Sequence, residues 1–143
     1  MKTLKILFIS LFIIFISYSI ANSKDYSSTK PLHCSVAYVN ECTAWEGCES
    51  IDPFEANSPY FLEVNLATKT ISGSTTLTRA RKTPIERIET IDELITLSGA
   101  EPQSKGDKYK FGWIMTISTE TGQMILSANT NSSALVIFGR CID

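Results

Sequence analysis

The chain has 143 residues, and its 15 acidic and 13 basic residues give a formal net charge of −2. Nucleic-acid binding needs a basic face for phosphate contacts, so this balance excludes nucleic acid as an expected partner. The length, with 43% hydrophobic residues, is enough for one domain with a buried core.

The N-terminus has the organisation of a secretory signal peptide. Lys2 and Lys5 precede an almost wholly apolar run over residues 6–16, and Ser19-Ile20-Ala21 supplies the small residues of a cleavage site. The apolar run is shorter than the ~20 residues that span a bilayer. We therefore expect a signal peptide over residues 1–21, no stable membrane span after cleavage, and a periplasmic or secreted protein. A retained membrane anchor is the alternative.

A polar stretch separates the expected cleavage site from the first apolar segment. Residues 22–33 predict a flexible leader, and residues 34–143 predict a single β domain. The first strand of that domain is expected over residues 34–39.

Alternation marks the next strand. In residues 60–66, Tyr60, Leu62, Val64 and Leu66 share one face, as in a half-buried strand. A turn follows at residues 67–69. The next strand is expected over residues 70–72, and Gly73 permits a bulge before a further strand over residues 75–79.

Residues 83–97 fit two structures. Thr83-Pro84-Ile85-Glu86 matches a helix capping box with proline at the first helical position. Against a helix, the segment is crowded with β-branched side chains, and its apolar residues spread around the whole helical circumference. We favour two strands, over residues 85–91 and 94–98, joined by a turn at Asp92-Glu93.

The C-terminal third reads as strands with clear turns. Residues 99–107 form an expected loop, and Tyr109, Phe111 and Trp113 begin the apolar face of the next strand, where we expect core packing. Turns are expected at residues 119–122 and 129–133, and strands at residues 123–128 and 134–140. The seven to nine short strands predict an all-β fold, a single-domain antiparallel β-sandwich or small β-barrel.

Four cysteines in an exported chain indicate a disulfide framework, for which three connectivities exist. The rival interpretation is a zinc site made from His33, Cys34, Cys42 and Cys48. It lacks the close cysteine pairs of zinc knuckles, so we expect no metal and no cofactor.

One connectivity follows if the first strand lies antiparallel to the last. Cys34 then faces Cys141 across the seam, within the ~5.5–6 Å Cα separation typical of a disulfide. Cys42 and Cys48 remain and close a small loop around Trp45. The expected disulfides are therefore Cys34–Cys141 and Cys42–Cys48.

Three motifs near the C-terminus carry a resemblance. Gly112-Trp113 on a strand, Thr121-Gly122 in a turn, and the closing Phe138-Gly139-x-Cys141 resemble a group of short exported proteobacterial proteins of unknown function. The resemblance covers about the last fifty residues. It implies a bacterial periplasmic setting and no mechanism.

No group of residues predicts catalysis. His33 is the only histidine, no nucleophile elbow occurs, and the early acidic residues lack the order of a calcium loop. The short basic clusters at residues 79–82 and 105–110 are typical of exposed strand ends. We therefore expect a protein that is not an enzyme.

Two functions agree with these features. The first is a non-catalytic recognition or accessory module of the bacterial envelope, which presents Trp45, Glu46 and Glu49 on the disulfide-closed loop to an envelope macromolecule. The second is a lipocalin-like β-barrel carrier of a small apolar ligand. Trp45 itself has two interpretations, since it can also fold back as a lid over one end of the barrel.

Overall fold

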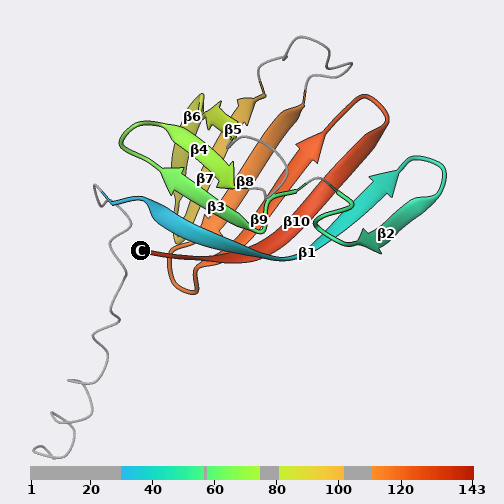
Figure 1. The fold of residues 1–143 in the computed structure, drawn as a ribbon. Coiled ribbons are helices and arrows are strands. Elements are labelled where there is room, and N and C mark those ends of the chain that lie inside the picture. The colour runs from blue at the N-terminus through green and yellow to red at the C-terminus, as the bar shows by residue number, and fades with distance from the viewer. Residues whose placement is uncertain (1–29, 57, 75–80, 102–110) are drawn as a thin grey trace, which may run out of the picture.

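The computed structural model describes residues 30–56, 58–74, 81–101 and 111–143, which form ten strands in one antiparallel sheet (Figure 1). The expected signal peptide, most of the expected leader and the expected strand over residues 75–79 lie outside the described residues. The strands are β1 (Leu32–Thr43), β2 (Gly47–Ile51), β3 (Phe61–Asn65), β4 (Thr70–Ser74), β5 (Arg81–Pro84), β6 (Arg87–Ile91), β7 (Leu94–Ala100), β8 (Gly112–Ser118), β9 (Gln123–Asn129) and β10 (Ser133–Ile142).

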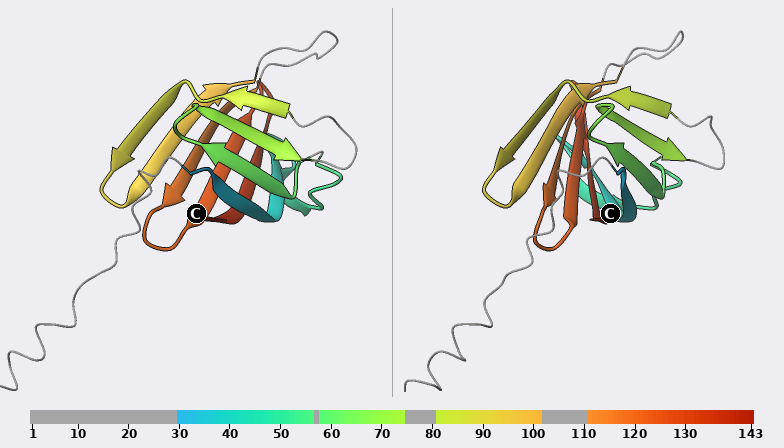
Figure 2. Two further views of the ribbon diagram at one scale, coloured as in Figure 1. Left: turned by 60° about the vertical axis from the view of Figure 1, so that its left-hand side comes forward. Right: turned by 90° about the vertical axis from the view of Figure 1, so that its left-hand side faces the viewer.

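The sheet is curled into a half-barrel whose two end strands are consecutive in the chain. Its order is β5-β4-β3-β1-β10-β9-β8-β7-β6, and β2 pairs with β1 beside this path. The end strands β5 and β6 meet at one corner, where the Ile85 N–H donates to the Lys69 carbonyl (2.8 Å) and the Glu86 N–H donates to the Ser98 carbonyl (2.9 Å). Figure 2 shows how the sheet bends around a shared interior between β3–β5 and β7–β9.

A bulge in β1 marks the point where this strand changes partners. One edge of β1 pairs with β10, from His33 to Thr43, with a register shift between Val36 and Tyr38. The other edge pairs first with β3, over Leu32–Ser35, and then with β2, over Val39–Thr43. Because a bulge bends its strand, the second half of β1 can pair with β2 on one edge while it stays paired with β10 on the other.

The core lies on the concave face, where alternate residues of each strand meet. On β8, Trp113, Met115 and Ile117 are buried, as the alternation predicts. The other buried apolar side chains are Leu32, Cys34, Val39, Leu62, Val64, Ile71, Ile85, Ile95, Leu97, Met124, Ile137 and Cys141. Leu32 is fully buried in β1, so the ordered strand begins two residues before the expected domain start at Cys34.

The all-β antiparallel prediction is confirmed, as one curled sheet with slightly more strands than expected. Residues 83–97 contain strands and no helix, and Asp92 turns the chain with a φ of 51°. Two details were wrong. Gly73 pairs in regular register with Leu62 and makes no bulge, and Gly99 lies in β7 instead of the expected loop.

Candidate functional site

The β1–β2 hairpin extends beyond the half-barrel and carries the expected site residues (Figure 1). Thr43 pairs with Gly47, so the turn is short. The Glu46 N–H donates to the Thr43 hydroxyl oxygen (3.1 Å), and Gly47 closes the turn with a φ of 83°, which glycine adopts without steric cost. Trp45 occupies the middle of this turn.

Both expected disulfides are present. Cys42 pairs directly with Cys48 across the hairpin, and Cys34 pairs directly with Cys141 between β1 and β10. In each pair the Cα atoms lie 3.9 Å apart, closer than the ~5.5–6 Å expected for a typical disulfide. The Cys42–Cys48 disulfide therefore stabilises the β1–β2 hairpin alone. The Cys34–Cys141 disulfide joins β1 and β10, the first and last strands in the chain.

The Trp45 side chain projects into solvent with 96% of its surface exposed. The interpretation of Trp45 as a lid over the barrel is therefore wrong. A short turn closed by Gly47 and held by the Cys42–Cys48 disulfide keeps the indole ring away from the half-barrel. An exposed tryptophan at the tip of a rigid hairpin is typical of an interaction site.

Acidic side chains surround this tip. Glu46 is exposed in the turn, and Glu49 on β2 lies directly opposite Glu41 on β1. Side chains alternate along a strand, so this glutamate pair and the Cys42–Cys48 disulfide lie on opposite faces of the hairpin. Two like charges in direct cross-strand register destabilise a sheet. The hairpin therefore keeps a charge pair that does not serve stability.

The sequence itself contains a signal for this acidity, in the distribution of its charged residues. Between Lys30 and Lys69 the chain has no lysine or arginine. The same segment contains six acidic residues: Glu41, Glu46, Glu49, Asp52, Glu55 and Glu63. The negative charge thus belongs to the whole N-terminal part of the domain, of which the hairpin is the most projecting element.

The loop that leaves β2 is organised by Asp52. Its Oδ1 accepts hydrogen bonds from the Phe54 N–H (2.8 Å) and from the Tyr60 hydroxyl (3.2 Å). Partial desolvation, then the hydrogen bond to Asp52 and its negative charge, raise the pKa of Tyr60 above its ordinary value. The Tyr60 side chain is 44% exposed, and its hydroxyl is protonated at neutral pH, as in any tyrosine, so it can act as the donor.

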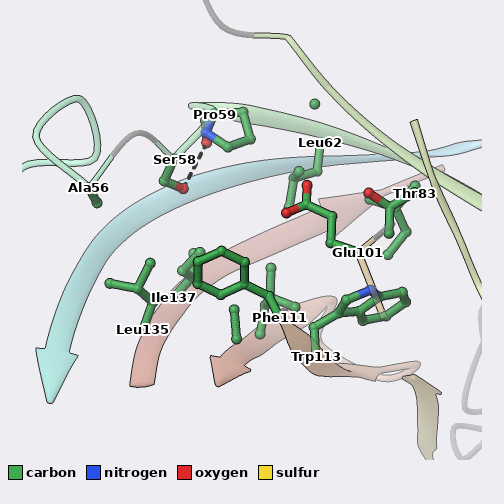
Figure 3. Close-up of a pocket in the computed structure, with 14 residues that line it drawn as sticks. Ala56, Ser58, Pro59, Leu62, Thr83, Glu101, Phe111, Trp113, Leu135 and Ile137 are labelled. Atoms are coloured by element: carbon green, nitrogen blue, oxygen red, sulfur yellow. Dashed lines mark hydrogen bonds between the residues drawn. The ribbon is translucent and has the colours of Figure 1, made fainter. Parts of the chain in front are cut away.

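This loop contributes to the wall of a cavity inside the half-barrel (Figure 3). The cavity has a volume of about 240 Å³. Its lining is mainly apolar and comes from the loop and from strands on both sides of the interior: Ala56, Ser58, Pro59, Leu62, Ile71, Gly73, Thr83, Glu101, Phe111, Trp113, Leu126, Ala128, Leu135 and Ile137. Sequence analysis placed Trp113 and Phe111 in the core but did not find the space beside them.

One polar atom at this wall lacks a partner. The Trp113 side chain is only 8% exposed, and its Nε1–H is buried without a hydrogen-bond acceptor among the described residues. Figure 3 shows the indole nitrogen on the side of the ring that faces Thr83 and Glu101. An unpaired buried donor of this kind costs about 1–3 kcal/mol.

The other residues singled out from the sequence form no site. His33 is exposed on β1, next to the buried Cys34. Within the described ranges, no cluster of histidine, cysteine, aspartate or glutamate could hold a metal ion. Lys105 and Arg79 lie outside the described residues. The same ranges contain no helix that is long and apolar enough to cross a membrane.

No protein-family model, curated protein or solved structure matches the chain. The resemblance of the C-terminal motifs to short exported proteobacterial proteins therefore stays a prediction. The observations define the chain at the level of its fold, as a disulfide-stapled all-β half-barrel with a protruding acidic hairpin.

Proposed function

We propose that the protein is an exported, non-catalytic recognition module whose partner docks on the tip of the β1–β2 hairpin. The exposure of Trp45 at that tip is the observation that carries the proposal. Tryptophan is among the residues that most often dominate interface energies. The Cys42–Cys48 disulfide fixes the loop before binding, so the partner does not have to order it.

The partner is an envelope macromolecule with a basic surface. Glu46 and Glu49 lie close to Trp45 in the hairpin, and Glu41 adds to their charge. Complementary charge increases the association rate, most strongly at low ionic strength. The lipocalin-like carrier has less support as the main function, because buried side chains such as Leu97, Met115 and Ile117 fill much of the interior.

Replacing Trp45 by alanine tests the docking surface. Since the side chain is exposed, Trp45→Ala should change the free energy of unfolding by no more than about 0.5 kcal/mol. The same variant should lose at least tenfold in affinity for partners captured from an envelope extract, as expected for a tryptophan hot spot worth about 2 kcal/mol. The measurements are urea unfolding and a quantitative pull-down against immobilised protein.

Phe61→Ala is the matched control, because Phe61 is an aromatic residue on β3 that is also exposed, by 66%, away from the hairpin. Its capture of partners should equal that of the unmodified protein. A large loss of stability in Trp45→Ala, or unchanged capture, contradicts the proposal.

Charge removal on the hairpin should affect stability and binding in opposite directions. Glu49→Gln removes the repulsion with Glu41 and should raise the free energy of unfolding by about 0.2–1 kcal/mol. It should also slow association with the basic partner at low salt, and the difference should shrink at high salt. Stopped-flow or surface-plasmon association rates at two ionic strengths provide the measurement.

Glu120→Gln serves as the control. Glu120 is exposed in the turn between β8 and β9, so its substitution removes one negative charge at a site away from the hairpin. Equal salt dependence in the two variants would show that only net charge matters, and the hairpin would then not be the docking surface.

A further inference from the structure

The cavity combines an apolar wall with a buried donor that has no partner among the described residues, which is the chemistry of a small-molecule site. Leu62, Ile71, Leu126 and Ile137 provide aliphatic surface, and the Trp113 indole provides both an aromatic edge and the unpaired Nε1–H. Most ligand sites have this composition, with a few polar groups that fix the orientation of a mainly apolar ligand.

The indole ring is held in place at this wall. A Cβ atom on Gly99 would lie 2.8 Å from Cζ2 and 3.1 Å from Cε2 of Trp113, so the ring packs closely against the glycine backbone of β7. This packing therefore fixes the direction in which the Nε1–H of Trp113 points. Because Nε1 is enclosed by its neighbours, an acceptor reaches it only when side chains at the cavity wall move.

Size and charge limit the ligand. A cavity of roughly 150 Å³ lined by apolar side chains holds benzene. By proportion, the volume of about 240 Å³ holds a ligand of about ten non-hydrogen atoms. The mainly apolar lining favours a neutral molecule over an ion, because burying a charge without a partner is costly.

We propose that this cavity binds a small, neutral, mainly apolar molecule with one hydrogen-bond acceptor, such as a ketone or an ester, and that the acceptor takes the Nε1–H of Trp113. The site is separate from the hairpin tip and does not depend on the identity of the hairpin's partner. Binding gives the Trp113 Nε1–H an acceptor, which it lacks among the described residues. A ligand with an acceptor should therefore bind more tightly than an apolar ligand of equal shape.

The two tryptophans of the chain make the test direct. In protein labelled with ¹⁵N at the indole nitrogens, Trp45 and Trp113 give one indole signal each, and Trp45 is the internal control at the surface. Acetophenone is the probe with an acceptor. Its isostere α-methylstyrene replaces the carbonyl oxygen by a methylene group and cannot accept the hydrogen bond.

Acetophenone should move the Trp113 indole proton downfield in a saturable manner and leave the Trp45 signal in place. It should bind about five- to tenfold more tightly than α-methylstyrene, which corresponds to one net hydrogen bond. Equal affinity of the two compounds, a Trp113 signal that neither compound moves, or a shift of the Trp45 signal alone would each overturn the proposal.

Two variants locate the site. Ala128→Leu places a larger side chain in the cavity, next to Trp113 in the cross-strand register, and should abolish binding of both probes. Ser127→Leu is the matched control, because the neighbouring residue of β9 faces away from the cavity and should leave binding unchanged. In Trp113→Phe, which keeps a ring but loses the donor, the preference for acetophenone should disappear. Retained preference in that variant would contradict the role of Nε1–H.

Discussion

Loss of the Cys34–Cys141 disulfide is expected to lower the free energy of unfolding by about 4–5 kcal/mol, the largest effect of any single bond in the domain. The two cysteines are 107 residues apart in the chain, so their link removes much conformational freedom from the unfolded state. Since a domain of this size is stable by about 5–15 kcal/mol, the double variant Cys34→Ala/Cys141→Ala should lose a third or more of its stability.

The second disulfide provides the comparison. Cys42 and Cys48 are only 6 residues apart, and the same reasoning gives about 2 kcal/mol for Cys42→Ala/Cys48→Ala. Urea unfolding of both double variants in oxidising buffer measures the difference. Equal losses would mean that the long link contributes through native packing alone and not through the unfolded chain.

Gly139→Ala should destabilise the protein by about 3 kcal/mol, because β10 has no room for a side chain at this position. A Cβ atom there would overlap the Ser35 carbonyl oxygen and lie 2.7 Å from Met124 Cε. Ser35 precedes the bulge where β1 changes partners, so the backbone cannot move aside without disturbing that change. The expected result is a clear decrease of the urea midpoint with folding retained.

Gly112→Ala is the natural control. This glycine begins β8, is exposed, and its Cβ position has no heavy atom within 4 Å. The substitution should alter the free energy of unfolding by less than about 0.5 kcal/mol. Gly112 and Gly139 belong to two of the three C-terminal motifs described above. Similar effects of the two substitutions would show that close approach of β1 to β10 is not the reason for Gly139.

Local patterns predicted most of the strands, but not β2 or β5. Alternation identified β3 and β8, since each strand has one face in the core and one toward solvent. The Cys34–Cys141 pair followed from a single assumption, that the first strand meets the last. The choice of strands over a helix at residues 83–97 rested on β-branched side chains, which fit the sheet formed by β6 and β7.

Apart from the pairing of the first strand with the last, features that depend on contacts distant in sequence could not be predicted. Nothing near Ala37 shows that β1 bends there, because the bulge arises from pairing with β10 and from the change of partner. The corner at Ile85 forms only where the two end strands of the sheet, β5 and β6, meet. The exposure of Trp45 depends on turn geometry, and a hydrophobic pattern does not determine which way a tryptophan in a short turn points.

The position of β10 beside β1 also determines when folding can finish. In the sheet, β1 lies between β3 and β10. The edge of β1 that pairs with β10 therefore stays unpaired until this last strand, Ser133–Ile142, has been synthesised. Long-range pairing of this kind is slow to form, because a long loop must close before any of its contacts can stabilise it. The short β1–β2 hairpin has no such requirement and can close early. This order suits the export proposed above, because the sheet cannot close around an incomplete sequence.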